Sequence, residues 1–141
     1  MKVFTPTGPN AAQAKSMFRS LDSVAGKVIG IIDNTMPNGN DLVDDIDALL
    51  VEKYKVARVI KHRKQPKGLT PDEVMKRLTD ECDAMIVGMG NSGAPVSWCV
   101  RDSVRAASTG IPVVHLGTDE FVALGRTVAL SLGHADLPMI A

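Results

Sequence analysis

The chain is poor in cysteine and in aromatic residues, and each scarcity argues against a class of protein. Its 141 residues include two cysteines, Cys82 and Cys99, which form no Cys-x-x-Cys pair. Two cysteines are too few for the disulfide framework of a small secreted domain, so a reducing, cytoplasmic location is predicted. Aromatic residues make up 4% of the chain, which argues against the stacking platforms that bind single-stranded nucleic acid.

The chain also lacks an excess of either charge, and it lacks long apolar runs. Lys and Arg together number 16, as do Asp and Glu, so the formal net charge is zero. We therefore expect no nucleic-acid partner, because such binding needs a clustered basic face. No stretch has the length and hydrophobicity of a membrane span, and no signal peptide is recognisable, so no membrane association is expected. The one dense basic run, residues 61–64, is interpreted either as a solvated strand end or as a contact for an anionic substrate.

Buried-strand patterns and helix signals alternate along most of the sequence. Residues 1–26 are predicted to form an irregular N-terminal arm, and residues 27–141 a single α/β domain. Strands are expected at 27–33, 56–61, 83–89, 111–116 and 137–140, and helices at 40–55, 71–80, 95–110 and 119–133. Asn40, Thr70 and Thr118 are the expected helix caps. This alternation predicts a flavodoxin-like doubly wound parallel sheet of about five strands, with order 2-1-3-4-5.

The segment 85–98 is the most informative part of the chain, because it has the pattern of a buried strand, a glycine-rich turn and a helix start. Gly88, Gly90 and Gly93 lack Cβ atoms where the backbone must turn tightly or let a ligand come close. Pro95 suits the first helical position. The free N–H groups at such a helix start, together with the helix dipole, favour an anionic group. The Gly-x-Gly-x-x-Gly string is weak support for a dinucleotide site, since no acidic residue ends the next strand.

In an open parallel sheet with this strand order, ligands bind where the strand order reverses, between the first and third strands. The loops there, 33–38 and 90–94, are rich in small polar residues. The predicted substrate-binding residues are Asn34, Asn38, Gly90, Asn91, Ser92, Gly93 and Ala94. Either asparagine can instead serve to shape its turn. Ser92 is either a helix cap or a ligand contact, and no adjacent base marks it as a nucleophile.

His62, Ser92 and Cys99 are the predicted catalytic residues. His62 ends the second strand near the proposed crevice and is a candidate general base. His115, within the fourth strand, is either a core histidine or a catalytic one. Cys99 lies one turn into a helix whose dipole is expected to lower its pKa, so it is either a reactive thiol or a buried hydrophobe. The three histidines have no metal-ligand spacing, so no metal or other cofactor is predicted.

Several segments, taken in order and spacing, resemble the UGSC-type family, which is named for a selenocysteine/cysteine-Gly-Ser-Cys motif. They are Asp33-Asn34-x-x-Pro37-Asn38, Cys82-Asp83-Ala84, the glycine-rich turn with Ser97-Trp98-x-Val100-x-Asp102, and Gly110-Ile111-Pro112. Pro6-Thr7-Gly8 and Ala135-Asp136-Leu137-Pro138 also look familial. The family is distantly similar to the selenoprotein subunits of glycine and betaine reductases. The resemblance implies an α/β domain with the motif turn at its active site.

The chain departs from the family motif at both of its redox positions. Ser92 stands where the family has selenocysteine or cysteine, and Pro95 stands where the family has the second cysteine. Neither residue supports thiol or selenol chemistry. We therefore expect an enzyme that kept the anion pocket and lost redox chemistry, catalysing addition or elimination on a small carboxylate as a hydratase or lyase does.

Two alternatives to this expectation remain open. One is a non-catalytic or incomplete subunit of a larger assembly, and the other is a residual thiol redox protein that uses Cys99. A homo- or hetero-oligomer is expected, with a small anionic substrate as the ligand.

Overall fold

Four helices and five strands alternate along the part of the chain that the structure describes. The structure is a computed structural model, and it describes residues 17–65 and 68–141. Most of the predicted arm therefore lies outside the described residues. The elements are β1 (Val28–Asp33), α1 (Gly39–Glu52), β2 (Arg58–Arg63), α2 (Asp72–Glu81), β3 (Ala84–Gly90), α3 (Gly93–Ala107), β4 (Val113–Gly117), α4 (Asp119–Ser131) and β5 (Met139–Ile140).

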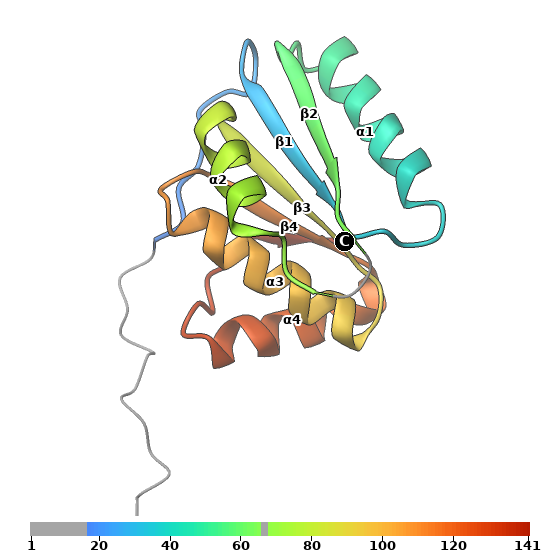
Figure 1. Cartoon of the computed structure of the whole chain (residues 1–141), viewed down its shortest axis with the longest axis vertical. Coiled ribbons are helices and arrows are strands. Elements are labelled where there is room, and N and C mark those ends of the chain that lie inside the picture. Colours follow the sequence, from blue (N-terminus) through green and yellow to red (C-terminus); the bar gives the residue numbers. More distant parts are fainter. Residues whose placement is uncertain (1–16, 66–67) are drawn as a thin grey trace, which may run out of the picture.

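All five strands run parallel in one sheet of order β2-β1-β3-β4-β5, so the predicted doubly wound topology is confirmed. The crossover through α1 leads away from β3, and the next three lead in the opposite direction across the sheet. Because such crossovers are right-handed, α1 covers one face and α2, α3 and α4 cover the other, as Figure 1 shows. The strand order reverses between β1 and β3.

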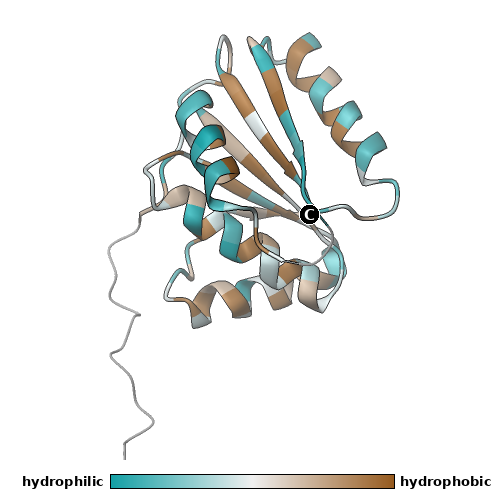
Figure 2. Ribbon diagram, in the orientation of Figure 1, coloured by the Kyte–Doolittle hydropathy of each residue, from teal (hydrophilic) through white to brown (hydrophobic). Residues whose placement is uncertain are grey.

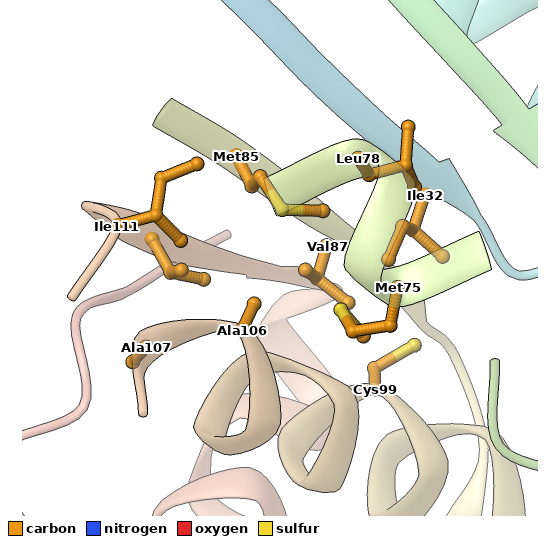
Figure 3. Packing of buried hydrophobic residues seen from close by; sticks show 10 residues of the cluster. Ile32, Met75, Leu78, Met85, Val87, Cys99, Ala106, Ala107 and Ile111 are labelled. Carbon is orange, nitrogen blue, oxygen red and sulfur yellow. The ribbon is translucent and has the colours of Figure 1, made fainter. Parts of the chain in front are cut away.

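The main core lies between the sheet and the pair α2 and α3. Its buried side chains come from β1, β3 and β4 and from both helices, and Figure 3 shows Cys99 pointing from α3 toward Met75 of α2. A second cluster of Val96, Val100, Ala129 and Leu137 joins α3 to α4. Figure 2 shows β1 as hydrophobic along most of its length, whereas α1 and α2 alternate between hydrophilic and hydrophobic residues. This is the pattern of strands buried on both faces and helices buried on one.

Three predicted helix starts were wrong in detail. Helix α1 begins at Gly39, and the residue before it, Asn38, adopts a left-handed conformation with φ 59°, so Asn40 lies inside the helix. Helix α2 has no side-chain cap, because the hydroxyl of Thr70 donates to Asp102 instead. Helix α3 begins at Gly93, two residues before Pro95. A proline in the first turn is tolerated, since the N–H groups there have no partner within the helix.

None of the described helices is both long enough and apolar enough to cross a membrane.

Candidate functional site

The glycine-rich turn begins with an irregularity at the end of β3. Val87 pairs with His115, but Gly90 pairs with Gly117, so β3 holds one more residue than β4 over this interval. A Cβ at Gly88 would lie 2.9 Å from the carbonyl oxygen of Leu116, and one at Gly90 would lie 3.1 Å from the Cα of Val96. These two glycines let strand and helix backbones approach closely, so packing within the chain accounts for both of them.

Gly93 differs from the other two glycines, because a Cβ added there would meet nothing within 4 Å. Ser92, Gly93 and Ala94 are exposed, and Ser92 is the N-cap residue of α3. The hydroxyl of Ser92 makes no capping hydrogen bond. The amino end of a 15-residue helix therefore faces open space without a side-chain cap. Free N–H groups and the positive end of a dipole at a helix start favour an anionic group in general.

The loop after β1 begins beside β3. The N–H of Asn34 donates to the carbonyl of Gly88 in β3 at 2.7 Å, which continues the pairing of β1 and β3 by one residue into the predicted loop 33–38. Asn38 is exposed and precedes α1 as its N-cap residue in a left-handed conformation, which fits the turn-shaping interpretation of this residue. The buried carboxylate of Asp33 accepts from the N–H of Thr35 at 2.8 Å and lies 3.6 Å from the Nε of Arg63.

His62 lies on the same face of the sheet as α2 and α3, because it is two residues from Ile60, which packs against the main core there. It pairs with Ile32, which in turn pairs with Val87. Its backbone is therefore two strands, or about 10 Å, from β3. Burial lowers the pKa of His62, and the charges of Arg77 and Lys64 add to the effect. The imidazole is thus predominantly neutral at pH 7 and can accept a proton.

A buried ion-pair network links the segment between β2 and α2 to α3. The carboxylate of Asp102 accepts from Lys64 Nζ at 2.9 Å, from Thr70 Oγ1 at 2.8 Å and from Arg105 at 2.8 Å. The backbone N–H of Thr70 also donates to Asp102. The side chains of Lys64 and Asp102 are 2% and 0% exposed. Sequence reasoning missed this network, although Asp102 belongs to the segments that resemble the family.

Cys99 does not have the lowered pKa that the sequence suggested. The side chain is fully buried in the main core, and this desolvation raises the pKa of its thiol to about 12. The dipole expectation was wrong because Cys99 is the seventh residue of α3, beyond the first turn where the dipole acts most strongly. The structure therefore favours the small-hydrophobe interpretation of this residue.

His115 is the buried polar side chain that the described residues leave without a partner. Its side chain is 0% exposed, and neither ring nitrogen makes a hydrogen bond. Burial lowers the pKa of His115 to about 4, so the ring is neutral at pH 7. Its Cε1 lies 3.4 Å from where a Cβ would stand at Gly90, and its Nε2 lies 3.4 Å from where a Cβ would stand at Gly117.

The structure offers no metal cluster in its described parts. Within residues 17–65 and 68–141, no three His, Cys, Asp or Glu side chains gather in a way that would hold a metal ion. A groove of about 630 Å³ lies away from the turn, between α2 and the carboxyl end of α3, where Arg105, Asp83 and Pro112 line it.

The chain thus falls in the class of doubly wound α/β domains, with polar loops after β1 and β3 at the switch point of the sheet. Within that class, the chain belongs to the UGSC family, whose model matches residues 2–141. Comparisons with curated proteins and with solved structures give no match.

Proposed function

We propose that this chain is a non-redox enzyme of the UGSC family that binds a small carboxylate at the turn between β3 and α3. The reaction is an addition or elimination of the hydratase or lyase type. The observation that carries the proposal is the uncapped, solvent-open start of α3 at Gly93, at the carboxyl edge of the sheet. Serine and proline at the two redox positions of the motif fit this loss of redox chemistry.

In this proposal the N–H groups at Gly93 and Ala94 hold the carboxylate, with the side chains of Asn34, Asn91 and Ser92 around it. In an elimination, a base removes a proton from the carbon next to the carboxylate, and the electrons of that C–H bond form the new double bond. The hydroxyl on the neighbouring carbon gains a proton and leaves as water. Fixed N–H donors stabilise the negative charge that builds up on the carboxylate oxygens.

His62 is the candidate base of this proposal, because it stands at the carboxyl end of β2 on the face that α2 and α3 cover, and its neutral imidazole can accept a proton. Lys64 is the less suitable base, since its ammonium group is buried and bonded to Asp102. Cys99 has no catalytic role here, because a thiol with a pKa of about 12 is not a thiolate at pH 7.

Binding is tested by thermal shift of the full chain against carboxylates, phosphates, thiols and nucleotides. A carboxylate at one hundred times its dissociation constant should stabilise the protein by about 2.7 kcal/mol. Ser92→Ala should weaken this stabilisation, and the matched control Ser108→Ala, at the other end of α3, should not. Stabilisation by nucleotides alone, or by a carboxylate equally in both variants, would contradict the proposed site.

A second candidate function, a subunit of a larger assembly, is favoured by exposed apolar side chains. Leu130 and Ile140 are 58% and 54% exposed, and an apolar groove of about 320 Å³ runs past Val24, Ile86 and Val114. Exposed apolar surface of this kind is typical of interfaces. The molar mass of the purified chain, measured by light scattering during size exclusion, tests this candidate. A monomer of 15.0 kDa over the micromolar range would refute self-association.

A further inference from the structure

The unpartnered ring of His115 lies below the point where two helices begin. Gly90 and Gly117 end β3 and β4, and they stand immediately before the N-cap regions of α3 and α4. The N–H of Thr118, the N-cap of α4, donates to the carbonyl of Gly90 at 3.1 Å, so the two helix starts are held together. The outer atoms of the His115 ring face both glycines. The ring is thus directed toward the edge of the sheet where the proposed ligand binds.

Neither helix start is capped by the side chain of its N-cap residue. Ser92 and Thr118 both have extended backbones and make no side-chain capping hydrogen bond. The helices are 15 and 13 residues long, so both carry a full dipole at this edge. The first turn of α3 carries no acidic residue, whereas Asp119 and Glu120 stand in the first turn of α4, so the start of α3 is the one that suits the anionic part of a ligand.

The ring of His115 supplies a different kind of recognition. A neutral imidazole offers one N–H donor and one acceptor nitrogen, but no charge. Leaving such groups buried without a partner costs about 1–3 kcal/mol each, so an unpartnered ring calls for an explanation. An uncharged oxygen of a ligand, held next to the anionic group, would satisfy it directly or through one bridging water.

We propose that the substrate is a small hydroxy- or oxo-carboxylate, and that His115 hydrogen-bonds its uncharged oxygen while the start of α3 holds its carboxylate. This inference rests on the proposed function and narrows the substrate class. His115 thereby becomes a specificity-determining residue for the hydroxyl or keto group. Sequence analysis left it between a core and a catalytic histidine.

The test compares matched ligands that differ by one hydroxyl group. Malate and succinate form one pair, in which malate carries a hydroxyl placed as the proposed elimination requires, and lactate and propionate form a second pair that tests binding alone. Both pairs are titrated into the full chain by calorimetry. The wild type should bind the hydroxy acid of a pair about fivefold more tightly or better, which is the worth of one hydrogen bond. His115→Leu should bind both members with the affinity of the deoxy acid. Equal affinities in the wild type, or a preference kept in His115→Leu, would overturn the inference.

A second measurement needs no variant and so does not depend on His115→Leu folding. The ring ¹⁵N resonances of His115 are followed in the wild type during each titration. Lactate should shift them and propionate should not. If propionate binds and lactate leaves the ring unmoved, the inference fails while the carboxylate site stands. If no carboxylate of either pair binds, the proposed function fails and the inference with it.

Discussion

The buried network around Asp102 gives the largest stability effect that the structure predicts. Asp102→Asn keeps the shape of the side chain and removes its charge. The ammonium of Lys64, whose side chain is only 2% exposed, then has no counterion. Breaking a buried ion pair from one side costs about 3–5 kcal/mol. For a chain of this size that lowers the melting temperature by roughly 10 °C or more. Urea unfolding followed by far-UV circular dichroism measures the loss.

A double-mutant cycle separates the ion pair from the rest of the network. Lys64→Met removes the buried positive charge. The double variant Lys64→Met, Asp102→Asn should therefore lose about 2 kcal/mol less stability than the sum of the losses in the two single variants. The matched control is Asp80→Asn, because Asp80 pairs with Lys76 on the surface and such pairs contribute about 1 kcal/mol at most. A loss below about 1 kcal/mol for Asp102→Asn, or additive losses, would refute the reasoning.

Three further predictions follow from buried groups and close contacts. His115 has a pKa of about 4 in the folded state, so below pH 6.5 its ring takes up a proton in the unfolded state but not in the folded state. The free energy of unfolding therefore falls by about 2 kcal/mol between pH 7 and pH 5. The free energy of unfolding, measured at a series of pH values, should show this fall in the wild type but not in His115→Leu. Gly88→Ala should destabilise by about 2 kcal/mol or more, because the Cβ meets the backbone of Leu116, whereas Gly93→Ala should be nearly neutral by urea unfolding. Cys99 should react with a thiol reagent far more slowly than the half-buried Cys82, and equal rates in mass spectrometry would contradict its burial.

The order of elements and the sheet topology were predictable because both depend on local patterns. Runs such as 27–33 have the composition of strands buried on both faces, and the alternation with helices leaves few arrangements of the sheet. For the same reason the strand order could place the loops 33–38 and 90–94 after two neighbouring strands, β1 and β3. The site residues within these loops remain predictions.

The remaining features depend on contacts between residues far apart in the sequence. Thr70-Pro71-Asp72-Glu73 has the pattern of a capping box, but Asp102, 32 residues away, takes the hydroxyl of Thr70. Cys99 follows a helix start closely, yet its burial under α2 sets its pKa. Gly88 and Gly93 look alike in sequence, and only the approach of β4 distinguishes a packing glycine from an open one. Local patterns carry no information on such contacts.

The central claim is that a small carboxylate binds at the start of α3. A titration of the ¹⁵N-labelled chain with lactate, followed by backbone amide resonances, tests it most directly. We predict that the largest shifts occur at Gly93, Ala94 and Val96, with smaller ones at Asn34. Shifts confined to the groove beside Arg105, or no shifts at millimolar lactate and malate, would contradict the account.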